Sequence, residues 1–314
     1  MMTKRLKILI FTGDFQEYVA PVFYYFLCEL EKITDLTVWH ESGDINNILD
    51  QLKEKPDFIY FNEYGEMNSP VITGLKDLEI PFAIQLFDLH YQINKRKRAI
   101  REENIKHIFT VYRDSFHVWY KEFSDRMYWL PHHINTEIFK DYGLKKEYNY
   151  LLMGAMSRRT YPLRNMIVDR MKDNPGFVHH KHPGYRNIKD HEKNVFVREA
   201  YAKEINKAKI FLTGNSKYNY PLGKNFEVPA CNTLLLAPPS NELKDLGFIP
   251  EVHYIPINKE NFEEKAKYYL QHKSEREKIA RQGMEMVHER HSTSKRADQF
   301  VKVIKKIISD EKNN

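Results

Sequence analysis

YNYPLGKNFEVPACNTLLLAPP, residues 218–239, contains the pattern that decides the fold. A proline and a glycine mark a polar loop, a short helical segment with Glu227 follows, and the apolar run at 233–237 predicts a buried strand closed by two prolines. A strand that is apolar throughout and follows a helix is typical of an α/β domain with a parallel sheet. A carboxylate at a helix start, near a strand end, is well sited to bind the hydroxyls of a sugar or a ribose.

Outward from this stretch, two series of apolar runs alternate with segments of helical length. We predict strands at 7–12, 36–40, 58–61, 82–86, 107–111 and 127–130 in the first series, and at 148–153, 176–180, 209–213, 233–237 and 252–255 in the second. The clearest predicted helices are 18–30, 161–171, 196–207, 223–231, 240–246, 262–272, 274–288 and 293–309, with a frayed tail at 309–314. The fold class is therefore α/β.

The alternation halts between about 131 and 148, where the sequence loses its period. We therefore predict an N-terminal Rossmann-like domain at 1–140, a C-terminal Rossmann-like domain at 141–290, and a final helix at 291–314 that crosses back to the first domain. Two doubly wound domains that face each other across a cleft would bring the carboxyl ends of their strands to it, where ligands bind in such folds.

Composition points to a soluble globular protein, since 42% of the residues are hydrophobic and 29% are charged. No apolar run approaches the roughly 20 residues of a membrane-spanning helix, and the two cysteines, Cys28 and Cys231, imply no disulfide framework. We expect a cytoplasmic protein. The formal charge is +6, and the basic run 95–101 is either a solvated helix face or a contact for phosphates or lipid headgroups.

Polar residues follow two strands of the first series. Gly13 and Asp14 end the first strand, and a helix placed directly after them would offer free amides to an oxyanion, unless the glycine only serves a tight turn. Asp88 and His90 follow the fourth strand. His90 could donate a hydrogen bond to a transferred sugar, and Asp88 could orient it or an acceptor hydroxyl, or else cap the next helix.

The second series opens with a strand that ends at Gly154 and leads to Arg158, Arg159 and Arg164. A glycine that allows close backbone approach, followed by guanidinium groups, suits a diphosphate. Gly214 ends another strand of the same sheet among small hydrogen-bonding residues.

Lys224 and Glu227 lie one helical turn apart and so share a face of the short helix.

The clustered histidines, 132–133 and 179–182, have no cysteine or carboxylate at a zinc-ligand spacing, so we expect no metal site.

Several loose motifs occur together in a fairly specific order. They are Gly154 with Arg164, HPGY at 182–185, KNFE at 224–227, Glu242-Leu243, the helix pair at 269–280, and His291 with Arg296. In this order the segment from about 148 to 308 resembles the glycosyltransferase domain of CgeB-like spore-maturation proteins and, more broadly, retaining GT-B fold glycosyltransferases of the family-four type.

The resemblance implies a metal-independent, cofactor-free enzyme that transfers a sugar, with retention, from a UDP-, GDP- or similar nucleotide sugar. Glu227 matches the second acidic residue of the family's E-x7-E motif, which binds the ribose, whereas the first position is Asn219 here. Asn232 replaces the family's glycine after the helix and can still adopt a left-handed conformation.

The expected site residues fall into four groups: His90 and Asp88 for catalysis; Arg158, Arg159, Arg164 and Lys224 for the diphosphate; Glu227, Gly154 and Gly214 for the nucleotide; Gly13, Asp14, Asn219 and Tyr220 for the donor sugar or acceptor. The acceptor is left open among glycan, protein, lipid and DNA, and peripheral membrane contact is one option. The alternatives are a catalytically degenerate sugar-nucleotide or glycan-binding protein, suggested by Asn219, and a nucleotide-sugar epimerase on the same fold.

Overall fold

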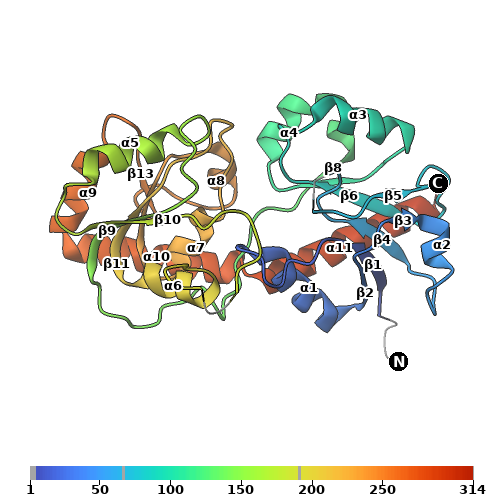
Figure 1. Cartoon of the computed structure of the whole chain (residues 1–314), viewed down its shortest axis with the longest axis horizontal. Helices are drawn as coiled ribbons and strands as arrows, with labels where there is room; N and C mark the ends of the chain where they lie inside the picture. Colours follow the sequence, from blue (N-terminus) through green and yellow to red (C-terminus); the bar gives the residue numbers. More distant parts are fainter. Residues whose placement is uncertain (1–4, 66–67, 190–191, 314) are drawn as a thin grey trace. The chain divides into compact units, whose positions relative to one another are not determined.

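The computed structural model describes residues 5–65, 68–189 and 192–313. The chain divides into two compact units, each with its own parallel sheet (Figure 1). Met1–Asp14, Phe23–Pro131 and Ser294–Asn314 form the first unit, and Phe15–Val22 and His132–Thr293 form the second. None of the described helices is both long and apolar enough to cross a membrane.

The main sheet of the first unit has six parallel strands in the order β2-β1-β4-β6-β7-β8. These strands are β1 (Lys7–Phe11), β2 (Asp35–Trp39), β4 (Phe58–Phe61), β6 (Phe82–Leu86), β7 (Ile108–Thr110) and β8 (Met127–Trp129), while β3 (Gly43–Asp44) and β5 (Ile72–Thr73) pair separately. The strand order reverses between β1 and β4, so the switch point of this sheet lies between them.

Helices cover the first sheet because its central strands are apolar on both faces. They are α1 (Val22–Ile33), α2 (Ile45–Leu49), α3 (Ile93–Glu102), α4 (Arg113–Trp119), the 3₁₀ helix η1 (Lys121–Arg126) and α11 (Thr293–Lys312). The apolar stripe of α11, with Phe300 and Ile304, packs on the same core as Tyr60 and Phe109. The C-terminal helix thus returns to the first sheet.

The second unit has a five-stranded parallel sheet in the order β10-β9-β11-β12-β13. Its strands are β9 (Tyr148–Gly154), β10 (Phe177–Lys181), β11 (Ala208–Leu212), β12 (Leu234–Ala237) and β13 (Ile255–Pro256). In chain order this is the doubly wound 2-1-3-4-5 arrangement, whose switch point lies between β9 and β11.

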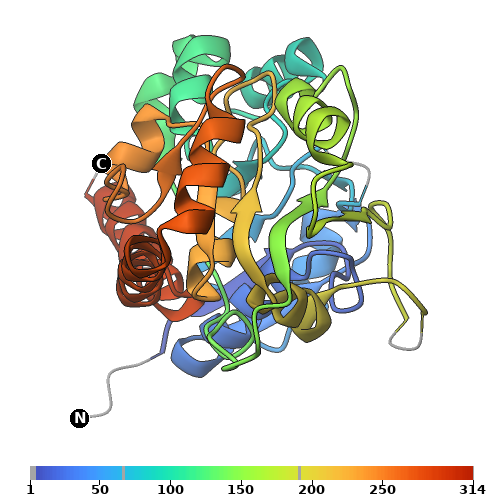
Figure 2. The same ribbon diagram turned by 90° about the vertical axis from the view of Figure 1, so that its left-hand side faces the viewer.

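Alternate residues of β9, β11 and β12 point to opposite faces and build two separate cores. The helices of this unit are α5 (Pro162–Met171), α6 (Arg198–Asn206), α7 (Lys224–Ala230), α8 (Asn241–Asp245), α9 (Phe262–Gln271) and α10 (Lys273–Arg290). Figure 2 shows this sheet with helices on either side of it. One core takes residues from α6 and α7, the other takes residues from α5 and α9, and α10 contributes to both.

The first helix differs from its prediction at 18–30. It begins only at Val22, and the preceding segment Phe15–Val22 groups with the second unit. Backbone bonds hold it there, from Val19 N to Arg186 O (2.9 Å) and from Ile188 N to Glu17 O (2.7 Å). The residues before Val22 therefore pair through their backbone with a distant segment, which local periodicity does not encode.

Two further predictions are wrong in detail. The strand expected at 252–255 is only Ile255–Pro256, because residues 252–253 are in a turn and Pro256 has no N–H to donate to the ladder. The tail expected to fray after 309 stays helical to Lys312. Its Glu311 Oε1 lies 2.8 Å from His107 Nε2, which ties the last turn to the first unit.

Candidate functional site

Two glycines mark the switch point of the second sheet. Gly154 ends β9, and Gly214 follows the end of β11. Gly154 has φ +139°, and a Cβ built on it would lie 2.9 Å from both Arg164 Nη1 and Lys224 Cε. A Cβ on Gly214 would lie 2.8 Å from the Cβ of Leu163, in the first turn of α5. Two cationic side chains and a helix start therefore reach the strand ends because both positions are glycine.

Arg164 is fixed in place. Its side chain comes from the first turn of α5, and the residue is only 3% exposed. Nε donates to Thr213 Oγ1 (3.1 Å), Nη1 donates to the Ala155 carbonyl (3.1 Å), and the guanidinium lies 4.1 Å from the centre of the Tyr161 ring. Burial lowers the pKa of this guanidinium, yet arginine keeps its charge. Nη2 has no hydrogen-bond partner among the described residues, and so can take an anion.

Lys224 and Glu227 are joined through a tyrosine. Lys224 Nζ donates to the Tyr201 hydroxyl (2.8 Å), which donates in turn to Glu227 Oε2 (3.0 Å), and Nζ lies 3.6 Å from the same carboxylate oxygen. The Lys224 and Glu227 side chains are 17% and 14% exposed. Burial lowers the pKa of Lys224 and raises the pKa of Tyr201 well above its usual value. At neutral pH the direction of this chain is fixed, because an ammonium only donates and a carboxylate only accepts.

The arrangement offers two adjacent kinds of binding group. Arg164 and Lys224 form a cationic pair against Gly154, and Glu227 presents a carboxylate beside them. Fixed, water-shielded cations suit a diphosphate, and an ionised carboxylate accepts hydrogen bonds from hydroxyls.

Comparison with known proteins gives the fold a name. Residues 158–302 match a family described as glycosyl transferase-like. A search of curated protein sequences finds no match. Among solved structures, sucrose-phosphate synthase from Thermosynechococcus elongatus aligns with a TM-score of 0.67 at 13% identity, over 98% of this chain and 100% of that one.

Anabaena HepE in complex with UDP-glucose aligns with a TM-score of 0.67 at 11% identity, over 96% of this chain and 100% of that one. A Rickettsia africae glycosyltransferase gives a TM-score of 0.60 at 11% identity, over 98% and 99%. The chain has the GT-B fold. The predicted fold class, with two Rossmann-like α/β units, is confirmed.

Within this GT-B chain, the four predicted diphosphate residues separate. Arg164 and Lys224 come together, whereas Arg158 forms a two-pronged ion pair with Asp169 (2.8 and 3.1 Å) and has a side chain that is 73% exposed. Arg159 is exposed in the turn before α5. Arg158 and Arg159 are not part of the cluster around Gly154 in this structure.

The loop before α7 carries the other predicted residues of this unit. Asn219 is exposed in a left-handed conformation (φ 57°), and its N–H donates to the Ser216 carbonyl (2.9 Å). Tyr220 is 3% exposed, and its ring lies 5.5 Å from that of Tyr218. Asn232, after α7, has φ 51°, the left-handed conformation expected there.

Tyr201 was missed from the sequence. The chain has 20 tyrosines, and nothing in the sequence distinguishes Tyr201 from the others. Its importance comes from the packing of α6 next to α7, which places its hydroxyl between Lys224 and Glu227.

In the first unit, Asp88 and His90 lie in the loop after β6, at the carboxyl end of the sheet. The alternative role of Asp88 as a helix cap is wrong, because the N-cap of α3 is Gln92. Instead its carbonyl accepts from Arg96 Nη1 (2.6 Å), whose residue is 2% exposed. The His90 ring lies 6.2 Å from that of Trp119. Arg96 thus fixes the loop that carries both predicted catalytic residues.

Gly13 and Asp14 follow β1 at the switch point of the first sheet. The helix start expected directly after them is absent from the described chain at that place, since α1 begins only at Val22. The oxyanion site of helix amides predicted there is therefore wrong. The hydrogen bond from Asn62 Nδ2 to Thr12 Oγ1 (3.0 Å), buried at the same switch point, was not foreseen.

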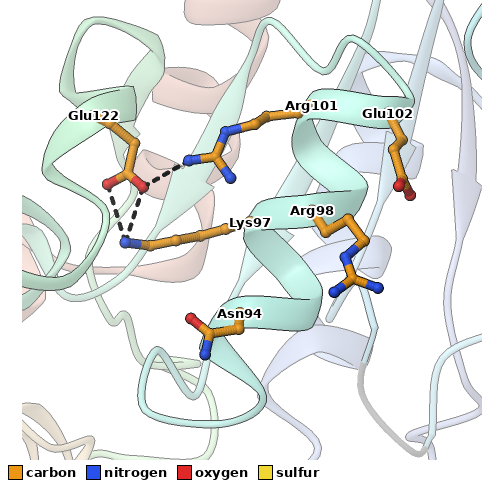
Figure 3. A pocket seen from close by; sticks show the side chains of 6 residues that line it. All are labelled: Asn94, Lys97, Arg98, Arg101, Glu102 and Glu122. Carbon is orange, nitrogen blue, oxygen red and sulfur yellow. Dashed lines mark hydrogen bonds and ion pairs between the residues drawn. The ribbon is translucent and has the colours of Figure 1, made fainter.

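The basic run 95–101 is not a uniform cationic surface. A pocket of about 560 Å³ lies along α3, with acidic as well as basic residues in its wall (Figure 3). Lys97 and Arg101 both pair with Glu122, at 2.9 and 3.1 Å, and Arg96 points into the protein. Of the residues considered as phosphate contacts, three are therefore committed to other partners.

Among the described residues, no three or more His, Cys, Asp or Glu side chains are grouped so as to hold a metal ion. Two of the noted histidines have other neighbours: His180 Nε2 lies 3.0 Å from Glu204 Oε2, and His133 Nδ1 lies 3.1 Å from Thr293 Oγ1.

Proposed function

We propose that this protein is a glycosyltransferase that takes a sugar from a nucleoside-diphosphate sugar and transfers it to an acceptor hydroxyl or amide. The main observation in support of this function is the cationic pair of Arg164 and Lys224, which lies against Gly154 at the switch point of a doubly wound sheet. Doubly wound sheets bind nucleotides at this place.

The chemistry follows from the charges. When the bond between the anomeric carbon and the diphosphate oxygen breaks, the electron pair stays on the leaving oxygen, and the acceptor forms the new bond to that carbon as it loses its proton. Arg164 and Lys224 stabilise the charge on the leaving diphosphate, most strongly where water is excluded. Arg164 is already oriented by Thr213 and Ala155, so little reorganisation is needed when the charge develops.

Glu227 is proposed to bind the ribose hydroxyls. Its Oε2 accepts from Tyr201, and its Oε1 would lie 3.2 Å from a Cβ on Gly223, so a glycine there leaves this oxygen room without any shift of the carboxylate. The glycosyl transferase-like match spans Arg164, Lys224 and Glu227 alike. The HepE structure with UDP-glucose supports a nucleotide-sugar donor for a chain of this fold.

The finer parts of the proposal come from the likeness to CgeB-like and family-four proteins. They are retention at the anomeric carbon, catalysis without metal or cofactor, and a UDP-, GDP- or similar nucleotide-sugar donor. Action in the cytoplasm is proposed from the sequence composition instead. His90 and Asp88 are proposed to serve the transferred sugar and the acceptor, and Gly13 and Asp14 are proposed to contact the donor sugar or the acceptor. A glycan, protein, lipid or DNA would be the acceptor.

A donor screen tests the proposal. UDP-, GDP- and ADP-sugars are incubated with the protein, nucleotide release is recorded, and binding of each free nucleotide is measured by calorimetry. Release or transfer from one donor is expected, with the matching nucleotide bound. Neither release nor binding across the panel would contradict the function.

Asn219 supports a second candidate, a sugar-nucleotide-binding protein without turnover. It stands eight residues before Glu227, where the resemblance expects a glutamate at the donor sugar, and it offers a neutral amide instead. Binding of one nucleotide without release from any donor, and recovery of release in Asn219→Glu, would favour this candidate.

A further inference from the structure

His182 is the first residue after β10, in the HPGY turn that the function above leaves without a role. In the sheet register the preceding residue, Lys181, pairs with Gly154. His182 therefore follows the strand that borders β9 directly, on the side away from β11. This places it beside the cationic pair of Arg164 and Lys224.

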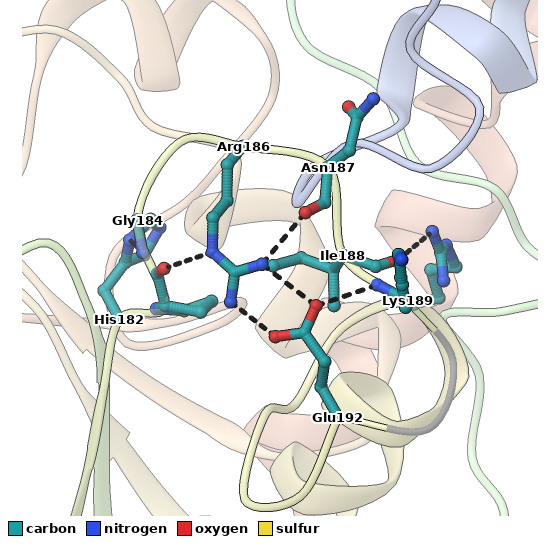
Figure 4. Close-up of polar contacts among 9 residues, drawn as sticks. His182, Gly184, Arg186, Asn187, Ile188, Lys189 and Glu192 are labelled. Carbon is teal, nitrogen blue, oxygen red and sulfur yellow. Dashed lines mark hydrogen bonds and ion pairs between the residues drawn. The ribbon is translucent and has the colours of Figure 1, made fainter.

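The tautomer of His182 is set by the turn. The N–H of Gly184 donates to His182 Nδ1 at 3.0 Å (Figure 4). A backbone N–H has no acceptor capacity, so Nδ1 must present its lone pair. Gly184 has φ +91°, a conformation that favours glycine, and it brings its N–H back to the ring. A neutral His182 thus carries its proton on Nε2.

The charge of His182 is set by its neighbours. Burial, and then the nearby charges of Lys224 and Arg164, lower its pKa to about 4. The imidazole is therefore neutral near pH 7, with Nε2 as a hydrogen-bond donor. No described residue provides a hydrogen-bond partner for Nε2. The Tyr185 ring lies 4.8 Å away and flanks the imidazole, while Tyr185 itself is 66% exposed.

The turn itself is braced. Arg186 donates to both carboxylate oxygens of Glu192, and its Nε donates to the Pro183 carbonyl at 3.3 Å (Figure 4). The backbone of 186–188 is bonded to residues 17 and 19. The segment after His182 is therefore held along its length, and this holds in place the Gly184 N–H that orients the imidazole.

We propose that Nε2–H of His182 donates a hydrogen bond to a diphosphate oxygen of the nucleotide-sugar donor. A neutral donor suits this place, because Arg164 and Lys224 already provide two positive charges and a third would repel them. The diphosphate has more oxygens than the two cations can satisfy, and each unpaired one would lose its hydration without compensation. This inference rests on the proposed function, since the ligand is that of the proposed donor site.

Two substitutions separate this role from a structural one. In His182→Asn the side-chain amide oxygen can take the place of Nδ1 and accept from the Gly184 N–H, but the distal donor is lost. In His182→Gln the longer side chain returns an N–H near the position of Nε2. The probes are UDP, GDP and the corresponding nucleosides, titrated by calorimetry into the full-length protein.

His182→Asn should bind the nucleoside diphosphate about tenfold or more weakly than the wild type does, whereas its affinity for the nucleoside should change little. His182→Gln should recover most of the lost affinity for the diphosphate. Nitrogen-15 spectra of the wild-type imidazole should show protonated Nε2 and bare Nδ1, with an Nε2 shift on adding the diphosphate. This spectrum does not depend on how the variants fold.

Wild-type affinity in His182→Asn, or an Nε2 signal that does not respond to a bound diphosphate, would overturn the inference and leave the proposed function intact. Failure of the wild type to bind any of the nucleotides would overturn both.

Discussion

The Nζ atom of Lys224 lies 2.8 Å from the hydroxyl of Tyr201, which is itself 3.0 Å from the Glu227 carboxylate. This single hydroxyl couples a cation proposed for the diphosphate to a carboxylate proposed for the ribose. Losing the hydroxyl should therefore disturb both parts of the nucleotide site at once.

Tyr201→Phe removes both hydrogen bonds and keeps the ring. We expect weaker nucleotide binding, by about tenfold, because each lost bond involves a charged group. Preference for a ribonucleotide over its 2′-deoxy analogue should also fall, since Glu227 is no longer oriented. Tyr148→Phe is the matched control, because that hydroxyl donates to Glu204 Oε2 (3.0 Å) instead. Equal effects of the two substitutions would argue against the coupling.

Arg164→Ala should lower affinity for the nucleoside diphosphate by about tenfold or more, since it removes a fixed cation. Arg158→Ala, in the same part of the sequence, should change affinity little, because Arg158 is exposed and paired with Asp169. Calorimetry on both variants gives the comparison. A larger loss of affinity in Arg158→Ala than in Arg164→Ala would indicate that the diphosphate does not bind beside Gly154.

Gly154→Ala tests the close approach at the switch point. Its Cβ would meet Arg164 Nη1 and Lys224 Cε at 2.9 Å and would sit at φ +139°. Nucleotide binding should be lost or strongly reduced. Gly143→Ala is the control, since it also has positive φ (64°) but nothing within 4 Å of the added Cβ, so only backbone strain of about 1 kcal/mol is expected. Thermal denaturation and calorimetry separate stability from binding.

His182 makes a prediction about pH. Its pKa of about 4 lies below the ordinary 6.5, so the unfolded chain binds this proton first as pH falls. Between about pH 6.5 and 4 the unfolded state holds more protons, and stability falls as the pH falls. The free energy of unfolding is measured in urea at pH 7 and at pH 5. Between these pH values the wild type should lose on the order of 1 kcal/mol more of it than His182→Asn does. Equal losses of unfolding free energy in the two proteins would indicate that folding does not lower the pKa of His182.

Much of the fold was predictable because apolar strands alternate with helices throughout the chain. Within the site, Arg164, Lys224 and Glu227 could be named from the sequence, because a glycine at a strand end and residues one helical turn apart have local signatures. The structure places Arg164 against Gly154 and pairs its neighbour Arg158 with Asp169, and neither arrangement can be read from the run of arginines.

The rest depends on contacts between segments far apart in the sequence. The pairing of residues 17–19 with 186–188, the burial of Arg96 inside a basic run, and the place of Tyr201 each come from tertiary packing. The start of the first helix was predicted too early for the same reason, because the backbone of residues 17–19 pairs with 186–188 and α1 begins only at Val22.

A crystal structure of the protein soaked with UDP or GDP is the most direct test of the proposed donor site. The diphosphate is expected between Arg164 Nη2 and Lys224 Nζ, with the ribose hydroxyls on Glu227. A nucleotide bound elsewhere, with these three side chains unoccupied, would contradict the site.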